Sequence, residues 1–162
     1  MSYRVYLAGP DVFRKDAKER AEKLKAILRE RDLEGVFPLD VDLKRLDGEP
    51  GPAFARRIFM ANVRLIRSTQ GVLANVEPFR GPSADVGTAW EMGFAKALGL
   101  PVVAYAMPTN AYEQRVHRNI DDMLIEDFGL SDNLMIACGA DETFVWLEEA
   151  ADVLGVLMEA NR

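Results

Sequence analysis

Short apolar runs alternate along this chain with longer stretches in which apolar residues recur every three or four positions. A short continuous apolar run is typical of a strand buried on both faces of a parallel sheet, and the longer spacing is typical of an amphipathic helix. The runs that predict strands are 3–8, 71–76, 101–106 and 134–138. The spacing predicts helices over 17–28, 54–65 and 146–157. Because strands and helices alternate, we expect an α/β fold with helices on both faces of a parallel sheet.

The segments between these elements give weaker signals. Gly35 is expected to end the first helix, and Val36–Phe37 is expected to form a second strand, which a proline stops. Residues 39–52 are polar, and a connection that long is often a functional loop. A short helix is predicted over 116–124 in an otherwise irregular stretch. The chain is thus expected to be a flavodoxin-like three-layer sandwich with a parallel sheet of about five strands.

Composition narrows the class of protein. With 162 residues, 49% of them hydrophobic, the chain can fill one core, so we expect a single domain over 1–162. The formal charge of −6 opposes binding to a nucleic acid polymer, because such binding draws its affinity from clustered Lys and Arg. The single cysteine, Cys138, excludes an internal disulfide and a cysteine zinc cluster. Small, neutral or weakly charged ligands are the expected partners.

The sequence carries no signal for secretion or for a membrane. The N-terminus enters a strand without a basic-then-apolar leader, and no apolar run approaches the roughly 20 residues that span a bilayer. We therefore expect a cytoplasmic protein with no membrane partner.

The stretch 81–99 is the strongest pointer to chemistry. It predicts a loop that feeds a helix directly after the buried strand at 71–76, and ligands bind at this junction in open α/β sheets. On the helix, Glu91 shares its face with small or apolar residues and with no cation. Such a glutamate is either solvated or held for chemistry, and two glycines in so short a helix favour the second. Asp85, by its spacing alone, predicts a helix N-cap.

The glycines of this stretch do not form a known phosphate-binding motif. No Lys-Ser/Thr pair follows Gly87, and no Gly-x-Gly-x-x-Gly follows any predicted strand. Sites for a nucleoside triphosphate or a dinucleotide are therefore disfavoured.

Three segments resemble one enzyme family. The run Asp85–Ala95, with Tyr6–Pro10 near the start and Ser131–Met135 near the end, resembles the nucleoside 2-deoxyribosyltransferase family. The resemblance implies a flavodoxin-like enzyme that moves 2-deoxyribose between nucleobases through a covalent deoxyribosyl-glutamate, with retention at C1′. It also implies deoxynucleosides and free nucleobases as partners, no cofactor, no metal, and a homo-oligomer whose subunits share active sites.

The resemblance assigns roles to particular residues. Glu91 stands at the position of the family's nucleophile. Asp85, six residues earlier, stands at the position of the family's Asp that gives the departing base a proton or a hydrogen bond. Because a desolvated carboxylate resists ionisation, a hydrogen-bond donor is needed to hold Glu91, and we expect Tyr6 to supply it. Asn62 stands where the family often has Asp, and an amide reads a base edge but does not readily deliver a proton. The other expected substrate-binding residues are Gly9, Asp40, Asp42, Gly87, Asn133 and Met135.

Some of these residues keep a second interpretation. Asn133 is expected either to reach the sugar 5′-hydroxyl in a neighbouring subunit or to be only a turn residue before a strand. Asp40 and Asp42 either contact the base or are solvated loop acids. His117 is the single histidine, has no nucleophile motif near it, and receives no role.

Two other functions compete with the transferase. The related deoxynucleoside 5′-monophosphate N-glycosidase passes the sugar to water, and it needs phosphate ligands where this chain has Pro10, Asp11 and Asp85. Acids repel a dianionic phosphate, which favours a substrate with a free 5′-hydroxyl, although Arg14 and Arg80 are possible cations. A non-enzymatic nucleotide-binding module on the same fold would bind a ligand without turnover.

Overall fold

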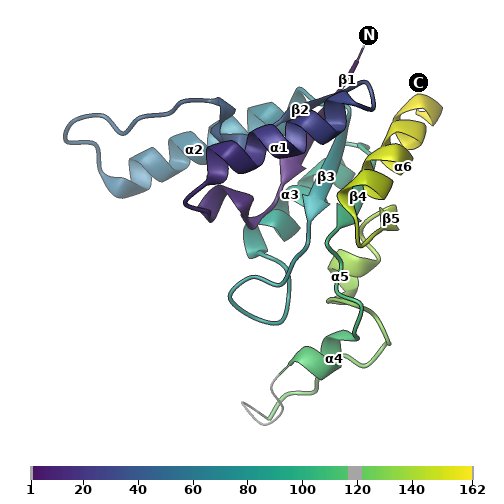
Figure 1. The fold of residues 1–162 in the computed structure, drawn as a ribbon. Coiled ribbons are helices and arrows are strands. Elements are labelled where there is room, and N and C mark those ends of the chain that lie inside the picture. Colours follow the sequence, from purple (N-terminus) through teal and green to yellow (C-terminus); the bar gives the residue numbers. More distant parts are fainter. Residues whose placement is uncertain (1, 117–121, 162) are drawn as a thin grey trace.

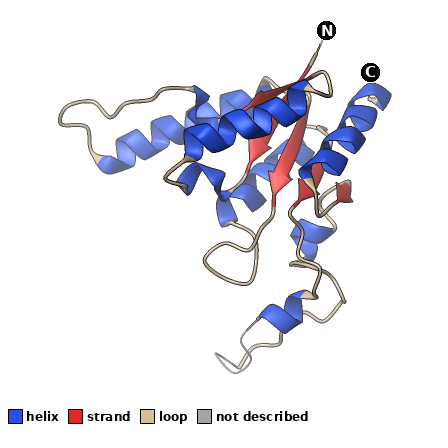
Figure 2. Cartoon of the chain, in the orientation of Figure 1, coloured by secondary structure: helices blue, strands red, loops and turns tan. Residues whose placement is uncertain are grey.

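The computed structural model describes residues 2–116 and 122–161. The order of its strands and helices is followed in Figure 1 and, coloured by type, in Figure 2. The strands are β1 (Tyr3–Ala8), β2 (Leu33–Val36), β3 (Gly71–Asn75), β4 (Val102–Tyr105) and β5 (Glu142–Thr143). The α-helices are α1 (Ala17–Arg29), α2 (Gly51–Arg67), α3 (Val86–Ala97), α4 (Tyr112–Arg115), α5 (Leu134–Ala137) and α6 (Leu147–Ala160), and the 3-10 helices are η1 (Pro10–Phe13) and η2 (Pro38–Asp40).

The sheet has the strand order β2-β1-β3-β4-β5, and every neighbouring pair is parallel. This confirms the predicted flavodoxin-like sandwich with a five-stranded parallel sheet. The order reverses between β1 and β3, which lie side by side at the centre. The carboxyl ends of two such strands frame the crevice in which open α/β sheets bind ligands.

Two apolar layers cover the sheet. Along β1, Val5 and Leu7 point into a cluster shared with α1 and α6, while Tyr6 and Ala8 point into a cluster shared with α2 and α3. This alternation follows from the pleat of a strand, which sends successive side chains to opposite faces. Figure 1 shows α1 in front of β1 and α3 behind β3. Tyr6 therefore projects from the centre of the sheet toward α3.

Two predictions about the elements were wrong, and a third falls mostly on residues that the structure does not describe. The apolar run 134–138 forms the helix α5 and not a strand, because Asn133 caps it by accepting a hydrogen bond from the Met135 amide. The fifth strand is instead the exposed pair Glu142–Thr143. Gly35 does not end the first helix; it lies within β2, paired with Val5. The helix expected over 116–124 falls mostly outside the described residues, and His117 lies outside them too. The helix α4 ends at Arg115, just before this expected helix.

Two segments extend away from the sheet. The loop after η2 and the first turns of α2 project to one side, and the segment around α4 projects beyond the carboxyl ends of the strands (Figure 1). Among the residues that the structure describes, no helix combines the length and apolar character needed to cross a membrane.

Candidate active site

The centre of the site is a hydrogen bond between β1 and α3. The Tyr6 hydroxyl donates to Glu91 Oε1 at 2.6 Å, joining residues 85 positions apart in the sequence. Tyr6 is fully buried on the face of the sheet that α2 and α3 cover, and Glu91 is only partly exposed. The two side chains expected to meet are therefore in direct contact.

Burial and neighbouring groups set the charge of this pair. The pKa of Glu91 is raised to about 7: burial is the largest cause, the Tyr6 hydrogen bond opposes it in part, and the nearby charge of Asp85 adds to the rise. Burial, together with the adjacent Glu91 carboxylate, raises the pKa of Tyr6 far above its usual range. Tyr6 thus stays protonated and remains a hydrogen-bond donor, while Glu91 titrates close to neutral pH.

The second carboxylate oxygen of Glu91 is not engaged. Tyr6 occupies Oε1, and no hydrogen bond or ion pair joins Oε2 to any residue in the described part of the chain. A carboxylate held at one oxygen and open at the other has the arrangement that a nucleophile requires. It contrasts with the carboxylate of a buried structural ion pair, which is saturated with donors.

Asp85 caps the helix that carries Glu91. Its Oδ2 accepts a hydrogen bond from the Thr88 amide at 3.1 Å, which confirms the N-cap expected from the spacing. Its Oδ1 accepts none from any residue within 2–116 and 122–161. Gly87 makes this placement possible, because a Cβ there would lie 2.8 Å from Asp85 Oδ2. Gly87, expected from the sequence to contact the substrate, thus leaves room for the Asp85 side chain.

Gly9 ends β1 with its backbone close to the neighbouring strand. It has φ +152°, and a Cβ there would lie 2.6 Å from Asn75 Cβ at the end of β3. Beside it, buried Asp11 accepts a hydrogen bond from Asn75 Nδ2 at 2.7 Å and pairs with Arg20 Nε at 3.0 Å. The charge of Asp11 is therefore compensated by Arg20 of α1.

The two cations proposed as phosphate ligands are engaged elsewhere. Arg14 pairs with Asp16, with contacts of 2.9 and 3.2 Å. The Arg80 guanidinium lies 4.6 Å from the Phe79 ring centroid and 5.3 Å from that of Phe13. These contacts favour a site that does not recruit either cation for an anionic ligand.

Asn62 lies on α2, which packs against α3, and it keeps an open acceptor. Its Oδ1 is buried and has no hydrogen-bond partner within the described ranges. A buried acceptor without a donor costs about 1–3 kcal/mol, so such groups call for an explanation. A ligand that donates an N–H group would satisfy it.

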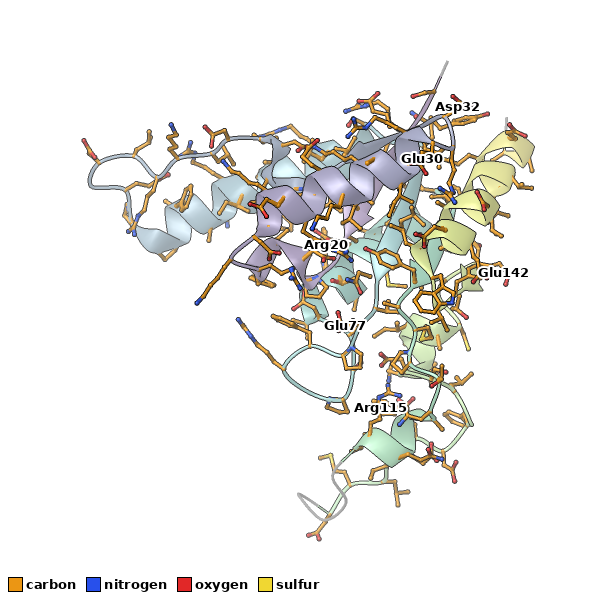
Figure 3. The ribbon with its side chains drawn as sticks, in the orientation of Figure 1. Arg20, Glu30, Asp32, Glu77, Arg115 and Glu142 are labelled. Carbon is orange, nitrogen blue, oxygen red and sulfur yellow. The ribbon has the colours of Figure 1, made fainter. Side chains whose placement is uncertain are left out.

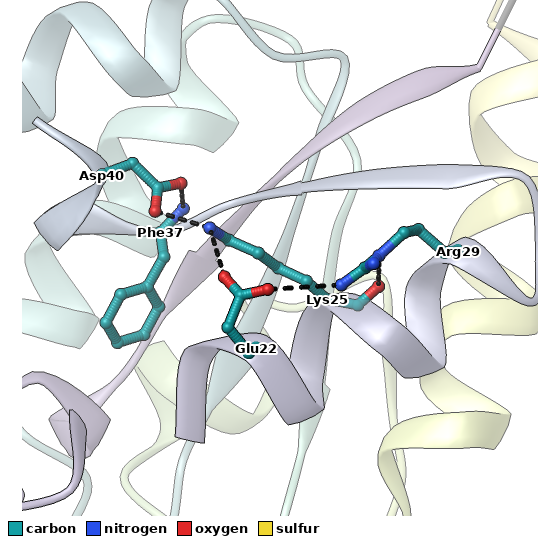
Figure 4. A network of polar contacts seen from close by, with 5 residues as sticks. All are labelled: Glu22, Lys25, Arg29, Phe37 and Asp40. Carbon is teal, nitrogen blue, oxygen red and sulfur yellow. Dashed lines mark hydrogen bonds and ion pairs between the residues drawn. The ribbon is translucent and has the colours of Figure 1, made fainter. Parts of the chain in front are cut away.

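No hydrogen bond or ion pair within residues 2–116 and 122–161 joins Asp40 or Asp42 to the Tyr6–Glu91 pair. Asp40 accepts hydrogen bonds from the Phe37 amide at 2.8 Å and from Lys25 Nζ at 2.6 Å, within a polar network on α1 (Figure 4). Asp42 is exposed and lies 3.7 Å from Lys44 Nζ. These contacts give Asp40 a structural role at the end of β2 and leave Asp42 a solvated loop acid.

Asn133 and Met135 lie on the other flank of α3. They line a cavity of about 390 Å³ together with Ala89, Met92 and Gly93, and Glu91 is not among its lining residues. Asn133 Nδ2 donates to Glu126 Oε1 at 2.5 Å, and Met135 is 75% exposed. Within one chain, therefore, no described contact brings Asn133 to the Tyr6–Glu91 pair.

Sequence reasoning missed two residues that organise this region, Asp132 and Arg115. Asp132 is 1% exposed and accepts hydrogen bonds from the loop before α3. Arg115, labelled in Figure 3, donates through Nε and Nη2 to one backbone carbonyl of that loop, that of Pro82. Asp132 adjoins Asn133 in a segment that the sequence singled out, but its partners lie 48 and 49 positions away, so spacing gave no signal.

Comparisons with known proteins agree with this geometry. The family description "Nucleoside 2-deoxyribosyltransferase" matches residues 5–135. The chain is 33% identical over 113 residues to "Uncharacterized protein C191.05c" of Schizosaccharomyces pombe, covering 69% of this chain and 54% of that protein. The chain thus spans about half the length of this relative.

Solved structures extend the likeness over nearly the whole chain. A 2-desoxiribosyltransferase from Leishmania mexicana is 28% identical, with 99% of each chain covered and a TM-score of 0.78. A 2-deoxyribosyltransferase from Bacillus psychrosaccharolyticus is 19% identical, with 92% of this chain and 90% of that chain covered and a TM-score of 0.61, which supports the fold alone. With its fold, its Tyr6–Glu91 pair and a family match over residues 5–135, the chain belongs to the nucleoside 2-deoxyribosyltransferase family.

Proposed function

We propose that this protein transfers 2-deoxyribose from one nucleobase to another by two displacements at C1′. Glu91 Oε2 attacks C1′ of the bound deoxynucleoside, a bond forms between that oxygen and C1′, and the N-glycosidic bond breaks. The electron pair of the broken bond goes to the base nitrogen. The observation that carries the proposal is the 2.6 Å hydrogen bond from Tyr6 to Glu91 Oε1, which holds the carboxylate and leaves Oε2 open.

The departing base needs a proton as it leaves. Asp85 Oδ1 is open while Oδ2 caps α3, so one oxygen can serve the base without loss of the helix cap. In the second step the incoming base attacks C1′, gives up its own N–H proton and releases Glu91. The departing base takes its proton from solvent by way of Asp85 Oδ1, and the incoming base returns its N–H proton by the same route, so the exchange is balanced; two inversions retain the configuration at C1′. These steps need no metal and no cofactor.

Asn62 is proposed to contact the base. Its buried Oδ1 lacks a donor, and a base that presents an N–H or an amino group supplies one. Gly9, whose close approach to Asn75 excludes a side chain, keeps the carboxyl end of β1 open for the sugar. Gly87 acts indirectly by allowing Asp85 to cap the helix.

Asn133 is proposed to serve a second subunit. Among the residues that the structure describes, no contact brings Asn133 to Glu91, which supports a role in sugar binding at the site of a neighbouring copy. Exposed Met135 lies two residues away and would enter the same contact. The protein is therefore proposed to be a homo-oligomer with shared active sites.

A free 5′-hydroxyl is the proposed substrate feature, in preference to a 5′-phosphate. Binding a dianion calls for a cation that is free to contact it, and Arg14 and Arg80 are both engaged. Asp11 adds little to this preference, because Arg20 compensates its charge.

Incubation with deoxyinosine and adenine tests the proposal against its rivals. Formation of deoxyadenosine supports the transferase, and loss of deoxyinosine without deoxyadenosine would mean that water is the acceptor. If neither changes, repetition with deoxynucleoside 5′-monophosphates distinguishes the monophosphate N-glycosidase from a binding module. Inosine in place of deoxyinosine is the control, and it should react far more slowly.

A further inference from the structure

The loop that leads into α3 is held by a carboxylate from a distant part of the chain. Asp132 Oδ1 accepts hydrogen bonds from the Ser83 hydroxyl and from the Asn133 amide, the latter at 2.7 Å. Asp132 Oδ2 accepts from the Ala84 amide at 3.0 Å. The side chain is 1% exposed, so both oxygens are buried and both have partners. One carboxylate thus ties the residue before Asp85 to the segment that contains Asn133.

Arg115 holds the same two segments through their backbones. Its Nε and Nη2 donate to the Pro82 carbonyl at 3.1 and 3.0 Å, Nη2 also donates to the Ser131 carbonyl at 2.5 Å, and Nη1 donates to the Asn110 carbonyl at 2.7 Å. Figure 3 shows Arg115 between α4 and the loop after β3. A planar guanidinium can make all these contacts at once, whereas a lysine ammonium is a point charge with one centre.

The loop itself has little to hold it in place. It runs from the end of β3 to Asp85, contains Gly81 and Pro82, and forms no helix or strand. Among the described residues, its backbone-to-backbone hydrogen bonds before Asp85 join the Val76 amide to the Tyr105 carbonyl and the Phe79 amide to the Ser83 carbonyl, each at 3.0 Å, and neither holds residues 80–82 or 84. The contacts with Asp132 and Arg115 therefore fix the last residues before the helix.

We propose that Asp132 and Arg115 are positioning residues that fix Asp85 relative to the Glu91 carboxylate. The inference rests on the proposed function, in which Asp85 serves the base while Glu91 attacks C1′. Asp85 follows Ala84 directly, so the direction in which its free Oδ1 points depends on where the Ala84 amide is held. A shift of about 1 Å between reacting groups costs up to about 100-fold in rate, which sets the scale of the effect.

The test compares Asp132→Asn with the wild type in the deoxyinosine and adenine assay. Asparagine has nearly the same shape as aspartate, but it has one acceptor oxygen, whereas the three donors around Asp132 bond to two oxygens. Its amino group would therefore face a donor. We expect kcat to fall about 10- to 100-fold with KM changed less than about 3-fold, because the misplaced group acts on the transition state. Asp141→Asn is the matched control. Asp141 also accepts a hydrogen bond from a backbone amide, that of Val102 at 2.8 Å, but it lies near the opposite end of α3. It should keep kcat within about 2-fold.

A double-mutant cycle separates positioning from a general loss of stability. If Asp132 acts through Asp85, Asp132→Asn should lower kcat less than about 2-fold in the Asp85→Asn background, because the group it positions is already gone. Equal losses in both backgrounds would overturn the proposal. If Asp132→Asn does not fold, Arg115→Lys replaces it in the same cycle with the same expectation.

The design also separates this proposal from the proposed function. Glu91→Gln is measured alongside, and if it keeps wild-type activity the transferase assignment fails regardless of Asp132. If Glu91→Gln is inactive while the losses from Asp132→Asn and Asp85→Asn are independent, the transferase stands and the positioning role fails.

Discussion

Replacing Glu91 with Gln removes a buried carboxylate whose ionisation the fold resists. Burial raises the pKa of Glu91 from 4.5 to about 7. Because the pKa is higher in the folded state, the unfolded chain releases this proton first, and the free energy of unfolding falls as the pH rises from 4.5 through about 7. At about 1.4 kcal/mol per pKa unit, the ionisation destabilises the fold by about 1 kcal/mol at pH 5 and about 3 kcal/mol at pH 8.5.

Urea denaturation of the wild type and of Glu91→Gln at both pH values measures this cost. The glutamine keeps an oxygen that can accept the Tyr6 hydrogen bond, so the variant should lose little at low pH. We expect it to match the wild type within about 1 kcal/mol at pH 5 and to be more stable by about 3 kcal/mol at pH 8.5. In a thermal scan that difference raises Tm by about 6–12 °C for a chain of this size.

Glu142→Gln is the control, because Glu142 is exposed in β5 and remote from the site. Its stability relative to the wild type should not change with pH. The reasoning is refuted if Glu91→Gln differs from the wild type by the same amount at both pH values, since the carboxylate would then be solvated in the folded protein.

Four further predictions concern activity and the helix cap. In the wild type, kcat/KM should fall as the pH drops below about 7, because protonated Glu91 cannot attack; a pH–rate profile checks this. Tyr6→Phe removes a hydrogen bond that lowers the pKa of Glu91, so the acidic limb of the pH–rate profile should move to higher pH, and activity should fall about 10- to 100-fold. Asp85→Asn removes a charge that raises the pKa of Glu91, so the limb should move to lower pH, and an unmoved limb would contradict the assigned coupling. Gly87→Ala brings a Cβ to 2.8 Å from Asp85 Oδ2 and should cost about 1 kcal/mol of stability in urea, through the lost hydrogen bond to Thr88.

Much of the fold follows from local pattern. The long buried strands have continuous apolar runs, and the helices that cover them repeat apolar residues at helical spacing, so both were predicted near their observed bounds. The run 134–138 misled because a short apolar run suits a buried strand and a short helix equally, and the Asn133 cap decided the outcome. The real fifth strand, Glu142–Thr143, is exposed and polar, and only its pairing with β4 defines it.

The contact between Tyr6 and Glu91 was expected from the sequence. Glu91 stood out because its helix offers it no cation, whereas Tyr6 was chosen through the family resemblance, as the donor that a buried Glu91 needs; the structure shows the two in contact. The contact of Asp40 with Lys25 could not be predicted from the sequence, since Lys25 lies on another element 15 positions away. Asp132 was overlooked for the same reason: the amides and hydroxyl that saturate a buried carboxylate belong to segments that only the folded chain brings together.

The transfer rate of Glu91→Gln with deoxyinosine and adenine, at a pH near 8 where wild-type Glu91 is ionised, tests the central claim most directly. The variant keeps the shape of the site and an acceptor for Tyr6, but its amide cannot form the covalent intermediate. The account predicts a folded protein whose turnover is lower on the order of 10³- to 10⁶-fold. A folded variant that forms deoxyadenosine at the wild-type rate would contradict it.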